Sequence, residues 1–497
     1  MTKAFQLSDF LEEYNNLIST ACLESKGKFA ALASPTLNKQ ETITFLFQRI
    51  IECGKERNDL AISIRNIFLF IPRIFYHFIN LTFIAHRFKV KSIPQNSIFI
   101  RTWLVPRSIV GYQVRDDYFR KLIDDLKINH SVVVGFQLLD YGFPLKQFKR
   151  AEKDENFIIP IGLLSFKDIV FVFVKYIFSA KLKLKNKYFY KGKDITGIIN
   201  KSLDSDFYRL RSFQAYLESA IAKKLKVFNP KILLYIFENQ AWEKAYLKAF
   251  EDTETITIGY QTSGFSLRFL NFFPARLDLE NALFPDKIFT VGELFTNTLK
   301  NIGHYPIPIE TFSALRFEYP SVNGKYIVEY PCEVIYKRIL YAFPVHVYQY
   351  IKIIKLLIEI FIDTEIEVHL KFHPLYNPDD MIEKIPHNFK IWNKDQTESL
   401  KELYDAVLFN DNSFGIEALM GGVRSFEFEF GEIYPETRLI SFDCYDAVMD
   451  KVKLIELKDQ ILSGSFVKKM NHEAIVNYIN KHYIPYTKVM ASFFSNN

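Results

Sequence analysis

The chain has 497 residues, of which 49% are hydrophobic and 16% aromatic; this length exceeds one ordinary core and suits two α/β domains. The formal net charge of +6 is weaker than a nucleic-acid-binding protein usually carries, so we expect no nucleic acid partner. The four cysteines form no CxxC pair and the first residues include acidic side chains, which argues against a disulfide framework, a zinc site or a signal peptide and favours a cytoplasmic protein.

Residues 1–90 are predicted to form a helical amino-terminal extension. Within it, residues 62–85 are apolar and approach the length of a bilayer span, but they include Arg65, Pro72 and Arg73. Charged groups near the centre of a bilayer are costly. We therefore expect a buried or interfacial helix pair, broken at Pro72, and not a transmembrane helix.

Residues 91–325 are predicted to form a Rossmann-like domain, because strand patterns alternate with helical ones through this part of the chain. Strands are expected at 97–104, 131–139, 231–237 and 255–260, with the last strand near 286–291. Polar side chains stand at the carboxyl ends of three of these strands, where ligands bind in open α/β sheets. These candidates are Asp140, Glu238, Gln261, Thr262 and Ser263.

A helical and basic insertion is expected near residues 160–225 of this domain. It contains an apolar helix at 166–180 and one long amphipathic helix at 203–226. Six lysines follow the apolar helix closely, a pattern typical of a protein that rests on an anionic lipid surface. A solvated basic loop beside a core helix accounts for the lysines equally well. They are Lys181, Lys183, Lys185, Lys187, Lys191 and Lys193.

A polar, turn-rich stretch at residues 318–337 marks the boundary of a second Rossmann-like domain, predicted at 326–470. Just before the boundary, Arg316 is a candidate cation of the ligand site. In the second domain, Lys371-Phe-His373-Pro374 follows a predicted strand at 366–372. His373 can donate hydrogen bonds to a phosphate oxygen, and Pro374 stiffens the turn that holds it.

A second motif, Asn412-Ser413-Phe-Gly-Ile-Glu417, follows a predicted strand at 406–409. Asn412 or Ser413 would cap a helix that begins near Phe414, and the free N–H groups of its first turn favour a phosphate. Both motifs fall at carboxyl ends of strands, so together they fit a nucleoside monophosphate or diphosphate.

The order of these motifs resembles the carboxyl-terminal domain of GT-B glycosyltransferases. It is most similar to bacterial enzymes of capsule and lipopolysaccharide assembly, including the Kdo and sialic-acid transferases, in which a His-Pro motif and a Ser/Thr pair hold the phosphate of CMP. The first motif falls on His373 and Pro374, and the second on Asn412 and Ser413, where Asn412 departs from the usual pair. The resemblance implies two Rossmann-like domains facing a cleft, with a final helix at 471–497 that crosses back.

The resemblance also implies the reaction: inverting, metal-independent transfer of Kdo or another nonulosonate from a CMP-sugar to a glycan or lipid-linked acceptor. It places the protein in the cytoplasm or peripherally on the anionic inner membrane. Lys371, His373 and the N–H groups after Ser413 would stabilise the leaving phosphate, and Glu417 would bind the ribose. The start of the helix after Ser413 and the side chain of His373 can neutralise the phosphate, so no metal and no separate cofactor are expected.

On the acceptor side, Glu238 would act as the base on the acceptor hydroxyl, with Asp140 in reserve. Gln261, Thr262 and Ser263 would donate hydrogen bonds to a sugar or phosphate, although Thr262 stands where related enzymes often carry a histidine. Two alternatives stay open. One is a CDP-polyol phosphotransferase of the teichoic-acid kind, and the other is a non-catalytic scaffold with the same fold.

Overall fold

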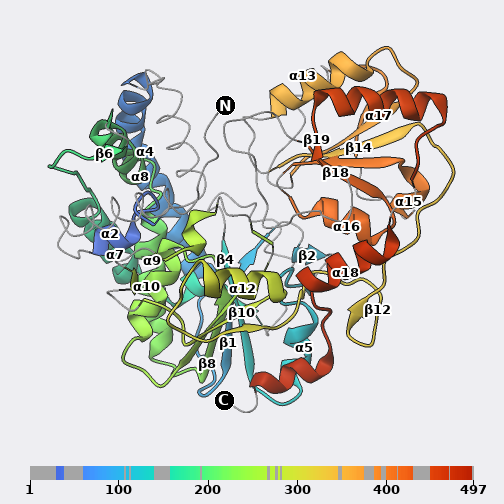
Figure 1. Cartoon of the computed structure of the whole chain (residues 1–497). Helices are drawn as coiled ribbons and strands as arrows, with labels where there is room; N and C mark the ends of the chain where they lie inside the picture. Colours follow the sequence, from blue (N-terminus) through green and yellow to red (C-terminus); the bar gives the residue numbers. More distant parts are fainter. Residues whose placement is uncertain are drawn as a thin grey trace.

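The computed structural model describes two doubly wound α/β domains and a group of helices attached to the first (Figure 1). The residues described are 29–38, 60–105, 108–110, 113–138, 157–190, 193–262, 264–265, 269–274, 278–279, 283–344, 350–373, 385–392, 399–410, 412–428, 448–468 and 471–494.

The first domain is built on a parallel seven-stranded sheet. The order across the sheet is β11 (Ile309–Thr311), β10 (Lys287–Thr290), β9 (Ile256–Tyr260), β8 (Ile232–Ile236), β1 (Ile98–Leu104), β4 (Val132–Leu138) and β5 (Phe157–Ile158). Strand β11 follows β10 along the chain, so the prediction that the strand near 286–291 is the last of this sheet is wrong. The helices α5 (Lys121–Lys127), α10 (Ala241–Phe250) and α12 (Glu293–Asn301) lie between its strands in the sequence.

The second domain is built on a parallel six-stranded sheet. Its order is β16 (Phe389–Ile391), β15 (Glu367–Lys371), β14 (Arg338–Ala342), β17 (Ala406–Phe409), β18 (Arg424–Phe428) and β19 (Val448–Met449). One face packs on α13 (Tyr350–Phe361) and α17 (Lys451–Ser463), and the other on α15 (Leu400–Leu403) and α16 (Phe414–Met420). Both faces are covered, which explains why the strands are apolar runs.

The strand orders of the two sheets are alike. In each, the first strand along the chain lies inside the sheet, the next two are added on one side, and the later strands are added on the other. This is the doubly wound arrangement, and its switch point lies between β1 and β8 in the first sheet and between β14 and β17 in the second. The predicted fold class, two Rossmann-like domains of the GT-B type, is confirmed.

The helical group contains α2 (Phe29–Ala33), α4 (Leu60–Arg87), α7 (Phe166–Ser179), α8 (Thr196–Tyr208) and α9 (Phe213–Lys226). The predicted break at Pro72 is wrong, because α4 continues through this exposed proline as one helix. The predicted single helix at 203–226 is also wrong. The chain turns between α8 and α9, where Leu210 adopts a left-handed conformation with φ of 60°.

The last described segment returns to the first domain. Helix α18 (His472–His482) contacts α12 and the short strand β13 (Lys325–Tyr326). The chain after α18 forms backbone hydrogen bonds with Val291 and Ala314 of the first domain. Ile484 N–H donates to the Val291 carbonyl at 3.0 Å, and Ala314 N–H donates to the Ile484 carbonyl at 2.7 Å. Gly292 permits this close approach, because a Cβ there would overlap the backbone carbonyl of His482.

We expect Gly292→Ala to lower the free energy of unfolding by about 2–3 kcal/mol, because the added methyl group must push the crossover segment away. Urea unfolding followed by fluorescence measures the change. Gly197→Ala is the matched control, since no atom lies within 4 Å of a Cβ built at this position on α8, and it should be neutral or slightly stabilising. Equal stability of Gly292→Ala and the control would contradict the close approach.

Candidate active site

The switch point of the second sheet is bridged by one side chain. Asn412 follows β17, and its Nδ2 group donates to the carbonyl oxygens of Ala342 at 2.8 Å and Phe343 at 3.4 Å, at the end of β14. The same group donates to the Asn410 carbonyl at 3.1 Å. Both central strands are thereby tied together at the edge where a doubly wound sheet binds ligands.

The other end of the Asn412 side chain starts helix α16. Its Oδ1 atom accepts from the Phe414 N–H at 3.0 Å, while Ser413 occupies the N-cap position without a capping hydrogen bond from its side chain. Of the two predicted capping residues, Asn412 therefore performs the role. Ser413 Oγ instead lies 3.5 Å from Glu417 Oε1, one turn into the helix. Asn412 is thus engaged by the fold at both ends of its amide.

Lys371 lies beside this helix start. It ends β15, and its Nζ atom is 4.7 Å from the ring centroid of Phe414 and 5.0 Å from that of Trp392. Two aromatic faces hold the ammonium group by cation–π attraction, so the cation has a defined place at the ligand edge. His373 follows two residues later and is half-buried. Pro374 lies outside the described residues.

At the switch point of the first sheet, the loop after β8 carries Glu238. Glu243 of α10 is buried and holds this loop, because its two carboxylate oxygens accept from the backbone N–H groups of Glu238 at 2.9 Å, Asn239 at 3.1 Å and Gln240 at 3.0 Å. Asn239 has a left-handed backbone with φ of 51°, and its Nδ2 group donates to the Asn271 carbonyl at 2.7 Å. Glu243 and Asn271 therefore fix where Glu238 lies.

Burial raises the pKa of Glu243 to about 8, and the hydrogen bonds from Gln240 and Glu238 N–H groups act in the opposite direction. The half-buried Glu238 carboxylate accepts from Gln240 Nε2 at 2.6 Å. The two acidic side chains thus have different surroundings. Glu243 is enclosed by the loop backbone, whereas Glu238 lines a cavity.

That cavity has a volume of about 120 Å³ and brings two predicted site residues together, Glu238 and Thr262. Gln261 is fully buried instead, and its Oε1 atom accepts from the Val291 N–H at 3.2 Å. Gln261 therefore stabilises the edge of the sheet, and its burial does not support the predicted contact with a ligand. Asp140 and Ser263 lie outside the described residues.

A second cavity, of about 240 Å³, adjoins the first through Gln240, which lines both. It lies between the α2 region and the start of α10, and Arg211 from the α8–α9 turn contributes a cation to its wall. Both cavities lie beside the Glu238 loop. The sequence pointed only to the first, because Arg211 and α2 are far apart along the chain.

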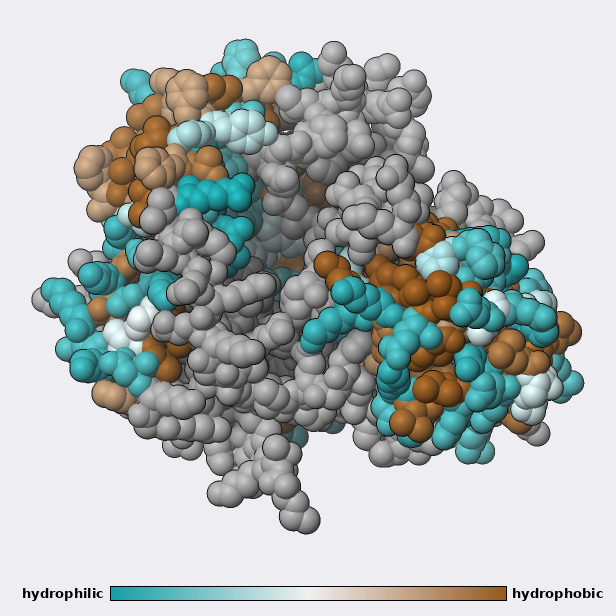
Figure 2. Space-filling view, turned by 90° about the horizontal axis from the view of Figure 1, so that it is seen from above, coloured by the Kyte–Doolittle hydropathy of each residue, from teal (hydrophilic) through white to brown (hydrophobic). Residues whose placement is uncertain are grey.

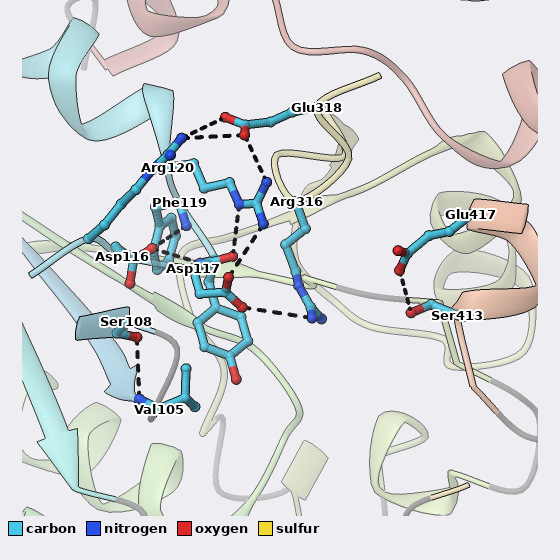
Figure 3. Close-up of polar contacts among 12 residues, drawn as sticks. Val105, Ser108, Asp116, Asp117, Phe119, Arg120, Arg316, Glu318, Ser413 and Glu417 are labelled. Atoms are coloured by element: carbon cyan, nitrogen blue, oxygen red, sulfur yellow. Dashed lines mark hydrogen bonds and ion pairs between the residues drawn. The ribbon is translucent and has the colours of Figure 1, made fainter. Parts of the chain in front are cut away.

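A cluster of charged residues stands on the first domain near the boundary (Figure 3). Glu318 pairs with Arg115 at 3.1 Å and with Arg120 at 3.0 Å, and Asp117 lies 3.4 Å from Arg120 and 4.0 Å from Arg316. Three arginines against two carboxylates leave a net positive charge. Arg316 was a candidate in the sequence, whereas Arg115 and Arg120 were not singled out there.

Asp116 anchors the loop that carries this cluster. It is buried, and it accepts from the Thr102 hydroxyl and from the N–H groups of Tyr118 and Phe119. Burial raises the pKa of Asp116, against the effect of the hydrogen bonds from Phe119, Thr102 and Tyr118. In Figure 3, Arg316 lies on the side of the cluster that is nearer to Ser413 and Glu417 of α16.

Comparisons with known proteins give structural neighbours only. No protein-family profile and no curated sequence matches the chain. The glycosyltransferase SnogD from Streptomyces nogalater aligns with a TM-score of 0.41 and 11% identity, over 81% of this chain and 100% of that one. The UDP-GlcNAc 2-epimerase from Neisseria meningitidis aligns with a TM-score of 0.41 and 12% identity, over 80% and 98%. The wall teichoic acid polymerase TagF aligns with a TM-score of 0.37 and 10% identity, over 88% and 96%. Likenesses of this degree do not decide an activity.

We expect Asn412→Ala to cost about 1–2 kcal/mol of stability, because it removes both a helix cap and the bridge to β14. Urea unfolding measures the cost, and amide hydrogen exchange at residues 414–417 measures loosening of the helix start. Asn412→Asp keeps the capping oxygen but lacks the N–H donors, so it should also be destabilised. Wild-type stability of Asn412→Asp would show that the bridge contributes nothing.

Proposed function

We propose that the protein is a glycosyltransferase of bacterial surface-glycan assembly, moving a sugar from a nucleotide-sugar donor to a glycan or lipid-linked acceptor. The observation that carries the proposal is the pairing of two doubly wound sheets, each with suitable side chains at the ligand edge beside its switch point. The second sheet offers the cation of Lys371, and the first offers the carboxylate of Glu238 in a cavity.

The donor is proposed to bind the second domain as a CMP-sugar, with Kdo or another nonulosonate as the sugar. This finer assignment rests on the resemblance of His373-Pro374 to the His-Pro motif. Lys371 and His373 would stabilise the negative charge that develops on the leaving phosphate, and Glu417 would hydrogen-bond the ribose. Positive charge from these side chains makes a metal-independent reaction chemically reasonable.

The acceptor is proposed to bind the first domain, in the space lined by Glu238 and Thr262. Glu238 would take the proton from the acceptor hydroxyl while that oxygen attacks the anomeric carbon, which inverts the configuration there. The hydrogen bond from Gln240 and the backbone contacts of Glu243 orient this carboxylate before substrate arrives. Asp140 is the reserve candidate for the base.

A thermal-shift titration of the full chain with CMP, CDP, UDP, GDP and ADP tests the donor. A nucleotide at about 100 times its Kd adds about 2.7 kcal/mol of stability if it binds only the folded protein. We expect CMP to raise the midpoint most. A shift with CDP and transfer of a polyol phosphate would instead support the teichoic-acid alternative, and no shift with any nucleotide would support the scaffold.

We expect His373→Ala and Glu238→Gln each to lower the rate of transfer at least about 100-fold, since each removes a group that acts in the transition state. Glu238→Gln should keep the nucleotide-induced shift, whereas His373→Ala should weaken it. Matched controls are His304→Ala and Glu251→Gln, which change exposed residues of the first domain away from the ligand edge. Undiminished transfer by His373→Ala would reject its role.

A further inference from the structure

One surface of the helical group is apolar and faces solvent. On α4, Phe68 is 78% exposed, and Ile71 and Phe75 are exposed beside it. On α7, Phe178 is 84% exposed, and Val174 and Phe171 are exposed one and two turns before it. We call these six side chains the α4–α7 face. Figure 2 shows apolar side chains gathered over this corner of the molecule.

The two helices that carry the face are joined to each other and to the domain. Phe78 of α4 packs edge-on against Phe166 and Phe173 of α7, with ring centroids 5.8 Å and 5.4 Å apart. Further along α4, Leu81 and Ile84 are buried in the core of the first domain. The exposed apolar side chains are therefore not needed to attach these helices to the domain, since both helices already have a buried side.

The packing of α4 on the domain favours binding to a membrane surface over crossing the membrane. Among the described residues, one helix segment, Arg65–Arg87, is long and apolar enough to cross a membrane. However, Arg73 in its middle donates to Asn66 Oδ1 and to the Tyr208 carbonyl, each at 3.2 Å. A crossing helix would have to break the bond to Tyr208 and leave the core, whereas a helix lying in the interface keeps both.

The charge around the face is mainly positive, because the acidic residue of α7, Asp168, is paired with Lys224. Residues 60–91 contain five arginines and lysines and no acidic residue. After α7, the side chains of Lys183, Lys185 and Lys187 are exposed to solvent. An apolar surface bordered by cations matches the headgroup region of an anionic bilayer, where aromatic side chains insert and lysines meet lipid phosphates.

We propose that the α4–α7 face docks the protein on an anionic lipid bilayer, with both helices lying along the interface and neither crossing it. The docking surface stands apart from the proposed sugar transfer and does not require it. It gives the predicted peripheral contact a defined location, on the helical group and away from the second domain.

Vesicle flotation of the full chain tests the proposal. The vesicles are phosphatidylcholine alone, or phosphatidylcholine with phosphatidylglycerol. We expect the wild type to float with the anionic vesicles, and the triple variant Phe68→Ser, Phe75→Ser, Phe178→Ser to lose at least about tenfold in partitioning. Lys183→Gln, Lys185→Gln, Lys187→Gln together should lose about tenfold, and added salt should reduce wild-type binding.

The matched control is the triple variant Ile351→Ser, Val452→Ser, Val467→Ser, which changes three comparably exposed apolar residues of the second domain. It should bind vesicles like the wild type. Thermal midpoints of all variants verify that they fold, and light scattering gives the oligomeric state. Failure of the wild type to float, or equal flotation of the Phe variant, would overturn the proposal. So would a wild-type dimer that the Phe variant converts to a monomer without any vesicle binding, because a second copy would then cover the face.

Discussion

The two domains depend on one short helix, α16, that belongs to both. Its buried side chains Ile416, Leu419 and Met420 are part of the hydrophobic core of the first domain, although the helix follows a strand of the second. The chain between the domains adds a backbone hydrogen bond, from Glu329 N–H to the Met420 carbonyl at 3.0 Å. Burial of apolar area is the main favourable term in folding, so the helix cannot leave either domain cheaply.

This constraint matters for the site, because the same helix begins where Asn412 bridges β14 and β17. Its hydrophobic side joins the first domain, while its amino end stands at the ligand edge of the second. A movement of one domain against the other must therefore move this end or bend the chain beside it. The ligand edge of the second sheet is thus mechanically connected to the domain that carries Glu238.

The strands could be predicted well from the sequence because a strand buried on both faces is a short, uninterrupted apolar run, as at 366–372 and 406–409. Helix boundaries were predicted less accurately, as the errors at Pro72 and Leu210 show. Pro72 lacks an N–H group, but it lies on the exposed side of a helix whose other side is packed against the domain, and tertiary packing outweighed the local penalty. The left-handed backbone at Leu210 could not be predicted from the spacing of apolar residues, so the turn between α8 and α9 was missed.

The polar contacts of the candidate site could not be predicted, because they join distant parts of the chain. Asn412 resembled one half of a phosphate-binding pair, yet its amide is used by carbonyl groups about 70 residues earlier. Arg115 and Glu318 become partners only through the fold. Glu238 and Thr262 could be grouped in advance for a simple reason: both follow parallel strands of one sheet, and such strands end at one edge.

The return of the chain to the first domain has a consequence for biosynthesis. Ile475, Ile479 and Tyr483 of the carboxyl-terminal segment, together with Phe494, are members of the first domain's core. A ribosome makes the seven-stranded sheet first, but these four side chains emerge only after the second domain has been made. Domains otherwise tend to fold in order during synthesis. Here the amino-terminal domain must wait in an incomplete state, with apolar surface uncovered, until the whole second domain has been made.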